Sequence, residues 1–390
     1  MRFPTAALLG LVGVVGCAFG VACGSSTDSA FGDSSSTPGG DAGTPGLGSS
    51  GGNSDATTPG QQGPTATGVV LVHAAAFPPF RLCFSNALDQ QPQPDSKVMP
   101  EANVVGVEQG SLIRLDHLDA PGEVFVIDEQ VVQSAPGATG GPSCKNLICG
   151  IPGADPVGGA KCLKATRDYD SAGTITEALG DKGVQVMGIS GCGNQFFVGD
   201  PRVNVAQADC GANYDPAKGN LTIKTVSLPP VTPATNKSIP VELVHMSFLL
   251  EGQKNGSALT VQFGTLAGPT TTTVAVDPQL FQNGTDTTLS VDQTDEAVYA
   301  QQGFRVLLGP VGGGPATFQK DLTLADVQSL SSPREVPSDY YTVASNYALL
   351  LLGDPRITND ARRGVHLLAV PVLDPAQLDA GTEGGTTGDQ

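Results

Sequence analysis

Apolar and polar positions alternate in short segments along most of the chain, with turn-forming residues between the segments. Residues Leu221–Leu228 (LTIKTVSL) alternate throughout, as a half-buried strand should. Helical spacing is scarce, and only Ile175–Leu179, Asp295–Gln301 and Leu324–Leu330 could each form a short helix. Because strands do not alternate with long helices, the pattern favours an all-β, Ig-like sandwich fold over a parallel α/β fold. Strands are expected at Val69–His73, Phe80–Phe84, Ser111–Leu115, Val124–Ile127, Val184–Met187, Leu221–Leu228, Val241–Leu249, Leu259–Phe263, Thr272–Val276, Phe304–Leu308, Tyr341–Leu352 and Val365–Val372.

The first residues follow a different pattern. Arg2 precedes a continuous apolar segment, Ala6–Val15, and small residues follow it up to Cys23. This order is typical of a secretory signal peptide. The apolar segment is shorter than the roughly 20 residues that a transmembrane helix needs. We therefore expect a signal peptide at residues 1–22 and a membrane attachment that uses no transmembrane helix.

Two cysteines compete as the end of this signal. Val-Val-Gly precedes Cys17 and Gly-Val-Ala precedes Cys23, and both sites resemble the lipobox of bacterial lipoproteins, whose cysteine receives a diacylglycerol. Cleavage before Cys17 leaves an apolar stub at residues 18–22, whereas a polar segment follows Cys23 directly. We expect lipidation at Cys23, with Cys17 or a freely secreted chain as the alternatives. Gly24, by resemblance to sorted lipoproteins, indicates the outer membrane, on the periplasmic side or at the cell surface.

Residues 23–66 consist almost wholly of Gly, Ser, Thr, Pro, Asp and Asn, without Lys or Arg. Such a segment cannot bury enough apolar surface to offset the entropy of ordering it, so we expect a disordered tether. A disordered tail is expected at residues 375–390. The remaining sequence is longer than one hydrophobic core usually serves, which predicts two sandwich domains, at residues 67–229 and 240–374. A Pro-rich linker at residues 230–239, beginning beside Pro229-Pro230, would join them.

The two predicted domains share sequence features in the same order. Val69–His73 (VVLVH) recurs as Val241–His245 (VELVH), and an alternating strand follows each copy after a Phe-containing loop. Gly-Asp-Pro-Arg at 199–202 recurs at 353–356, each time after an apolar strand. These matches predict an internal repeat.

The first copy resembles a known family. Leu71–Ala75 (LVHAA), Pro78-Pro79 and Phe80–Phe84 resemble the opening of exported bacterial β-sandwich domains of unknown function. Those domains begin with a valine-rich strand, a His-Ala pair and a proline-containing loop, and often occur in tandem on anchored cell-surface proteins. Here Ala-Phe-Pro-Pro replaces the family's Asp-Ala-Pro loop. The resemblance implies strongly diverged tandem sandwiches on a lipoprotein outside the cell, and it implies no activity. Segments that resemble the family's closing strands are Tyr341–Val343, Tyr347–Gly353 and Val365–Val370.

Six further cysteines all lie in the first predicted domain: Cys83, Cys144, Cys149, Cys162, Cys192 and Cys210. In an exported chain, an even set predicts three disulfide bonds, with connectivity left open among fifteen possibilities. The Gly/Pro-rich stretch Ala135–Gly159 has few apolar residues to hold it, and disulfides would attach it to the sandwich. A zinc site is the alternative, but the chain has no C-x2-C pair.

Motifs for catalysis are weak. Gly188–Cys192 (GISGC) departs from the G-x-S-x-G nucleophile elbow at its last position, and Gly309–Gly314 lacks the Lys-Ser/Thr of a phosphate-binding loop. His73 and His245 end apolar strands, which favours packing or hydrogen bonding over catalysis. His366 lies within a strand with no partner in the sequence.

Acidic residues give two alternatives. A hydrolase could use Asp116, Asp119 and Asp128 if the fold brings them together, and His117 could meet a metal beside them. Calcium could bind the acids around Asn283-Gly284, although the D-x-D-x-D-G spacing is missing. These acids are Asp277, Asp286, Asp292, Asp295 and Glu296.

The net charge of −18 arises from 38 acidic and 20 basic residues. A nucleic-acid function needs a basic surface, and none is visible in the sequence. Adsorption to anionic lipid is disfavoured for the same reason, so the lipid anchor is the expected membrane contact. We expect no cofactor and a non-catalytic binding or structural role at the cell envelope, with a protein or glycan partner that the sequence does not identify. The hydrolase and a calcium-stabilised adhesin remain the alternatives.

Overall fold

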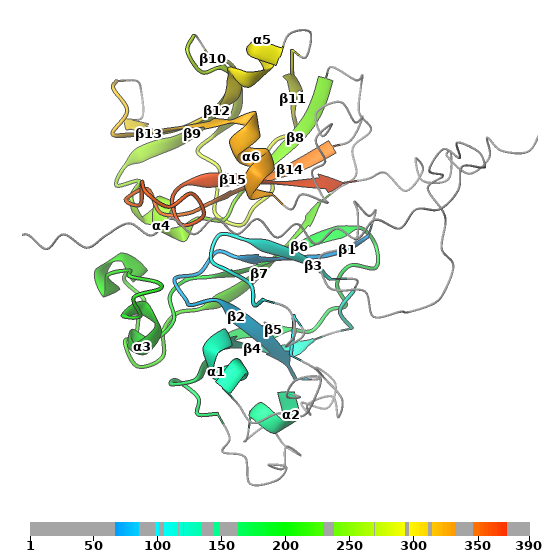
Figure 1. Ribbon diagram of the computed structural model, residues 1–390, viewed down its shortest axis with the longest axis vertical. Helices are drawn as coiled ribbons and strands as arrows, with labels where there is room; N and C mark the ends of the chain where they lie inside the picture. The colour runs from blue at the N-terminus through cyan, green and yellow to red at the C-terminus, as the bar shows by residue number, and fades with distance from the viewer. Residues whose placement is uncertain are drawn as a thin grey trace, which may run out of the picture. The chain divides into compact units, whose positions relative to one another are not determined.

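The all-β prediction is confirmed by the computed structural model, in which strands dominate and helices are short connections (Figure 1). The predicted signal peptide, tether and tail lie outside the described residues. So does most of the predicted linker, although Ser238 and Ile239 at its end already belong to a strand. The structure describes residues 67–85, 98–100, 105–115, 117–119, 121–134, 144–148, 163–228, 238–268, 270–292, 296–310, 314–331 and 346–372.

The N-terminal half, residues 67–228, contains two sheets. One has the strand order β3-β1-β6-β7 and the other β2-β4-β5. Apolar side chains from both sheets, among them Leu71, Leu82 and Met187, form the core between them. The strands are β1 (Gly68–His73), β2 (Phe80–Phe84), β3 (Leu112–Leu115), β4 (Gly122–Asp128), β5 (Tyr169–Ile175), β6 (Val184–Ser190) and β7 (Thr222–Leu228); the helices are α1 (Glu129–Ser134), α2 (Cys144–Leu147), α3 (Gln195–Val198) and the 3-10 helix η1 (Gln207–Cys210).

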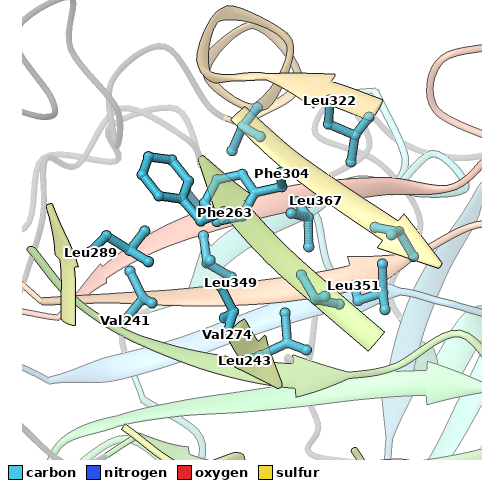
Figure 2. Close-up of a cluster of buried hydrophobic side chains, with 14 of the residues drawn as sticks. Val241, Leu243, Phe263, Val274, Leu289, Phe304, Leu322, Leu349, Leu351 and Leu367 are labelled. Atoms are coloured by element: carbon cyan, nitrogen blue, oxygen red, sulfur yellow. The ribbon is translucent and has the colours of Figure 1, made fainter. Parts of the chain in front are cut away.

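The C-terminal half, residues 238–372, repeats this design with the sheets β11-β8-β14-β15 and β10-β9-β12-β13. Figure 2 shows its core, in which the rings of Phe263 and Phe304 lie with centroids 5.1 Å apart among Val, Leu and Ala side chains. The strands are β8 (Ser238–His245), β9 (Ser257–Thr265), β10 (Thr270–Val276), β11 (Thr287–Ser290), β12 (Gln302–Pro310), β13 (Phe318–Thr323), β14 (Asn346–Leu352) and β15 (His366–Val372); the helices are α4 (Phe248–Gly252), α5 (Glu296–Ala300) and α6 (Leu324–Leu330).

Two of the three predicted helices are present. α6 occupies the predicted residues and begins at a capping box formed by Thr323 and Asp326, and α5 lies within the predicted range. The predicted helix at Ile175–Leu179 is wrong, because Ile175 ends β5 and a backbone bridge between Leu118 and Leu179 follows. The strand predicted from Val241 to Leu249 ends earlier, at His245.

The two sheets that carry the histidine-ending strands have the same topology. β1 lies parallel to β6 and antiparallel to β3, and β8 lies parallel to β14 and antiparallel to β11. The last strand of each sheet, β7 or β15, is antiparallel to its neighbour. Register matches as well, since Val69 pairs with Gln185 and Leu115, and Val241 pairs with Tyr347 and Thr287.

These two sheets also share an apolar core with each other. Along β1, Val69 and Leu71 face the N-terminal core, whereas Val70 and Val72 face a second cluster. We call this second cluster the junction core, because strands of both halves contribute to it. Strands buried on both faces have continuous apolar sequences, which explains VVLV in β1 and ALLLL in β14. The junction core contains Val70, Val72, Val184, Val186, Val226, Leu228, Val244, Met246, Ala348, Leu350, Leu352, Leu368, Val370 and Val372.

Candidate functional site at the junction of the two halves

Three of the four histidines are fully buried and bind structural partners. His73 Nε2 donates to the carbonyl of Pro78 at 3.1 Å, and His245 Nε2 donates to Glu251 Oε2 at 3.1 Å. Burial lowers the pKa of His73 to about 4 and lowers the pKa of His245 and His366 as well. These three rings have no solvent access, so they do not act as accessible bases or ligands.

His366 joins the two halves. Its Nδ1 lies 2.8 Å from the carbonyl of Gly364, and its Nε2 lies 2.9 Å from the carbonyl of Gly110. Gly110 has a φ of +72°, and a Cβ atom at this position would overlap the carbonyl of Arg362. The close approach of the two halves at this point therefore requires glycine.

The two Gly-Asp-Pro-Arg segments share one set of hydrogen bonds but not one backbone: Gly199, with a φ of −76°, follows the helix α3 and not the expected strand, whereas Gly353, with a φ of +96°, follows β14. In each, the Asp side chain accepts hydrogen bonds from the backbone N–H, Nε and Nη2 of the Arg two residues later, as in Asp200 with Arg202 and in Asp354 with Arg356. Arg202 also binds Asp128, at the end of β4, with distances of 3.0 and 2.6 Å. Arg356 instead forms an ion pair with a residue of the other half, Asp209.

Further polar contacts surround the junction core. Arg114 Nη2 donates to the carbonyl of Pro371 at 3.1 Å, and Asn283 Nδ2 donates to the carbonyl of Ser227 at 2.8 Å. Arg363 Nη2 donates to the carbonyl of Val203. Together with the contacts of His366 and Arg356, these hydrogen bonds connect the two halves at several points outside the apolar core.

A cleft of about 890 Å³ opens beside Asn283. This volume is in the range of small-molecule sites. Its N-terminal wall is the connection between β5 and β6 together with the adjoining ends of β6 and β7, and Asn283 belongs to the C-terminal half. Its lining residues are Glu177, Ala178, Asp181, Lys182, Gly183, Val184, Gln185, Ser227, Leu228 and Asn283.

A buried carboxylate lies on β8, two residues from Val244, which forms a backbone bridge with the cleft residue Asn283. Glu242 is 8% exposed and shares a face of β8 with Val244, which belongs to the junction core. The antiparallel register of β8 and β11 pairs Val241 with Thr287, so Asp286 comes next, opposite Glu242. Burial, and secondarily the charge of Asp286, raises the pKa of Glu242 to about 7.

The structure does not bring the proposed hydrolase carboxylates together. Asp128 is buried in its ion pair with Arg202, whereas Asp119 is exposed and lies 3.7 Å from the exposed His117. Asp116 lies outside the described residues. Ser190, the serine of the elbow-like segment, is buried at the end of β6.

The acids considered for calcium are dispersed. Asp277 pairs with Lys254 at 2.9 Å, Asp286 lies opposite Glu242, and Glu296 begins α5. Asp295 lies outside the described residues. In the part of the chain that the structure describes, no three His, Cys, Asp or Glu side chains are grouped so as to hold a metal ion.

Four cysteines form two disulfide bonds, Cys83–Cys144 and Cys192–Cys210. The first attaches α2 to β2, and the second attaches η1 to the segment after β6. Sulfur atoms in these bonds are not available as zinc ligands. Disulfides are compatible with an extracellular location. Cys17, Cys23, Cys149 and Cys162 lie outside the described residues.

No protein-family model matches the chain, and comparison with curated proteins finds no significant relative. Among the residues that the structure describes, no helix has the length and apolar character to cross a membrane.

Sequence reasoning missed Glu242 and the cleft. One signal was present, because Glu242 replaces Val70 when VELVH is aligned with VVLVH. A charged residue within an otherwise apolar strand marks a buried carboxylate that needs an explanation.

Proposed function

We propose that this protein is a lipid-anchored component of the bacterial cell envelope, with a non-catalytic binding module built from two diverged copies of one β-sandwich. The lipid on Cys23 would hold the module at the outer membrane, and residues 24–66 would act as the tether. A partner or ligand would bind the folded part.

The shared topology of the β1 and β8 sheets supports the duplication. Equal strand order, equal sense of pairing and equal register are accompanied by the same Asp–Arg hydrogen bonds at Asp200 and Asp354. In the first copy the Arg of this pair binds Asp128 of the same half, whereas in the second copy it binds Asp209 of the other half. Such a difference in partner is expected after duplication and divergence.

One observation carries the non-catalytic role: the side chains best suited to acid–base chemistry are used for structure. His73, His245 and His366 are buried against carbonyl or carboxylate groups. Asp128, the buried member of the proposed hydrolase set, is held by Arg202. A general acid or base must instead reach the proton that it transfers.

Metabolic labelling with an alkyne-tagged fatty acid tests the anchor. The full chain would be expressed in a bacterium with an outer membrane, alongside Cys23→Ser and Cys17→Ser variants as a matched pair. We expect label on the unsubstituted chain and on Cys17→Ser, and loss of label from Cys23→Ser, because only the acceptor cysteine is essential. If neither the unsubstituted chain nor Cys17→Ser carries the label, the lipid anchor is refuted. If only Cys17→Ser loses the label, the lipidated residue is Cys17.

A further inference from the structure

Buried carboxylates in the described fold have partners with a single exception. Glu129 binds Arg81, Asp128 binds Arg202, and Asp354 binds Arg356. Asp168 pairs with a neighbouring Arg side chain, and Asp170 accepts two hydrogen bonds from an Asn. Among the described residues, Glu242 alone in this set has neither an ion pair nor a hydrogen bond. The charged residue that shifts its pKa, Asp286, has the same sign.

The position of Glu242 relates this carboxylate to the cleft. Val244, two residues along the same face of β8, packs with Val184 and Leu228 in the junction core. Val184 and Leu228 also line the cleft, as does Asn283, which forms a backbone bridge with Val244. Glu242 and Asp286 are not lining residues themselves, but each is close in the chain to one member of the Val244–Asn283 bridge, through which they adjoin the wall of the cleft.

From the missing counter-charge and the adjoining cleft, we propose that this site binds a small organic cation with a primary amine. The ammonium group would lie between Glu242 and Asp286, in the role that Arg has at Glu129, Asp128, Asp168 and Asp354, and the rest of the ligand would occupy the cleft. This inference rests on the proposed binding function and names the class of ligand.

The lining favours an amine over other ligands. Ser227, Gln185 and Asn283 supply hydrogen-bonding groups, and the charged lining side chains are Glu177, Asp181 and Lys182. An anion would meet an excess of carboxylates. Ca²⁺ takes about six to eight oxygen ligands, more than two carboxylates supply, and the described residues hold no group of three or more His, Cys, Asp or Glu side chains that could bind a metal ion. One ammonium needs only the two carboxylates.

Proton linkage follows from the charges around Glu242. Asp286 faces it across the ladder, and Glu177, Asp181 and Lys182 face the cleft from the connection between β5 and β6. With a pKa of about 7, the Glu242 carboxyl is largely ionised at pH 8 and mostly protonated at pH 5.5. If the ammonium binds only the ionised form, affinity should fall by about 30-fold between these two pH values.

Calorimetric titration of the full-length protein in detergent tests the proposal. The probe is 1,4-diaminobutane, and 1,4-butanediol is the uncharged control of the same length. We expect binding of the diamine at pH 8, the about 30-fold loss at pH 5.5, and no binding of the diol. Glu242→Gln should abolish diamine binding, while Asp119→Asn should retain it, because Asp119 is an exposed acid that lies beside His117 and does not line the cleft.

Four results would each overturn the proposal: equal binding of diamine and diol, equal affinity at both pH values, unchanged affinity of Glu242→Gln, or no binding at millimolar diamine. A thermal melt of each variant shows whether it is folded. The fatty-acid labelling result is independent of these titrations. An unsubstituted chain that binds the diamine but carries no fatty-acid label would refute only the lipid anchor. A labelled chain that does not bind the diamine would refute only the amine site.

Discussion

Replacing Glu242 by Gln should make the protein more stable at pH 8. The substitution keeps the size and shape of the side chain but removes a negative charge from a position that is 8% exposed and opposite Asp286. A rise of the Glu242 pKa from 4.5 to about 7 corresponds to about 3 kcal/mol as an upper limit. Solvent screening at the edge of the junction reduces the expected effect to about 2 kcal/mol.

The sign follows from proton binding. Because the folded state holds this proton more tightly than the unfolded state, folding is favoured below the unfolded pKa of 4.5. This contribution to stability is lost as the pH rises from 4.5 through about 7. The Gln variant has no such proton, so its advantage should be near zero at pH 4.5 and complete at pH 8.

Urea unfolding at a series of pH values between 4.5 and 8, with the disulfides intact, measures the difference directly. Asp286→Asn should give a smaller gain, since the charge of Asp286 is the secondary cause of the raised pKa. Asp119→Asn is the control for net charge and should show little gain. Parallel pH profiles for Glu242→Gln and the unsubstituted protein would refute the reasoning, as would a loss of stability at pH 8.

Three further predictions concern the junction and its disulfide. Gly110→Ala should destabilise the protein by more than Gly211→Ala, as measured by urea unfolding. Both glycines have a positive φ, which costs about 1–2 kcal/mol for alanine. Only at Gly110 would the added Cβ atom also overlap backbone of the other half. Leu350→Ala should cost about 2–5 kcal/mol, and hydrogen exchange should increase in strands of both halves, because Leu350 belongs to the junction core; exchange confined to the C-terminal half would contradict a shared core. Replacing Cys192 and Cys210 by Ala should cost about 3 kcal/mol for a sequence separation of 18, and a melting temperature equal to that of the parent would contradict this loop-closure reasoning.

Local pattern was sufficient to predict most strands but not their packing. Thr222–Leu228 alternates because one of its faces is largely exposed, and it was predicted correctly. The strands β1 and β14 were also predicted, yet their unbroken apolar sequences gave no sign of which two cores they join. That pairing depends on contacts between segments that are far apart in the sequence.

The candidate site was not predicted because it, too, depends on contacts between segments that are far apart in the sequence. Glu242 is one acid among 38 in the sequence, and its importance arises only from burial and from the register that places Asp286 opposite it. The helix predicted at Ile175–Leu179 was wrong because pairing with another strand overrides a short helical pattern.

Because the β1 and β8 sheets have the same topology, the two edges of the junction can be compared position by position. We call the edge at Arg114 and Pro371 the first rim, and the edge at Asp286 and Ser227 the second rim. Arg114 pairs with Val70 in β1, and the equivalent pair in β8 is Asp286 with Glu242. At the first rim the Arg114 guanidinium reaches the backbone of Pro371, so its charge serves to fasten the halves. At the second rim a neutral amide, Asn283, makes the contact to Ser227, which occupies the register position equivalent to Pro371. The acids at the second rim do not make this contact and do not line the cleft themselves, although Asn283 does. One rim is thus connected through Arg114, whereas the other carries two acids and adjoins the cleft that Asn283 lines, which is the asymmetry expected if binding is confined to one side of the junction.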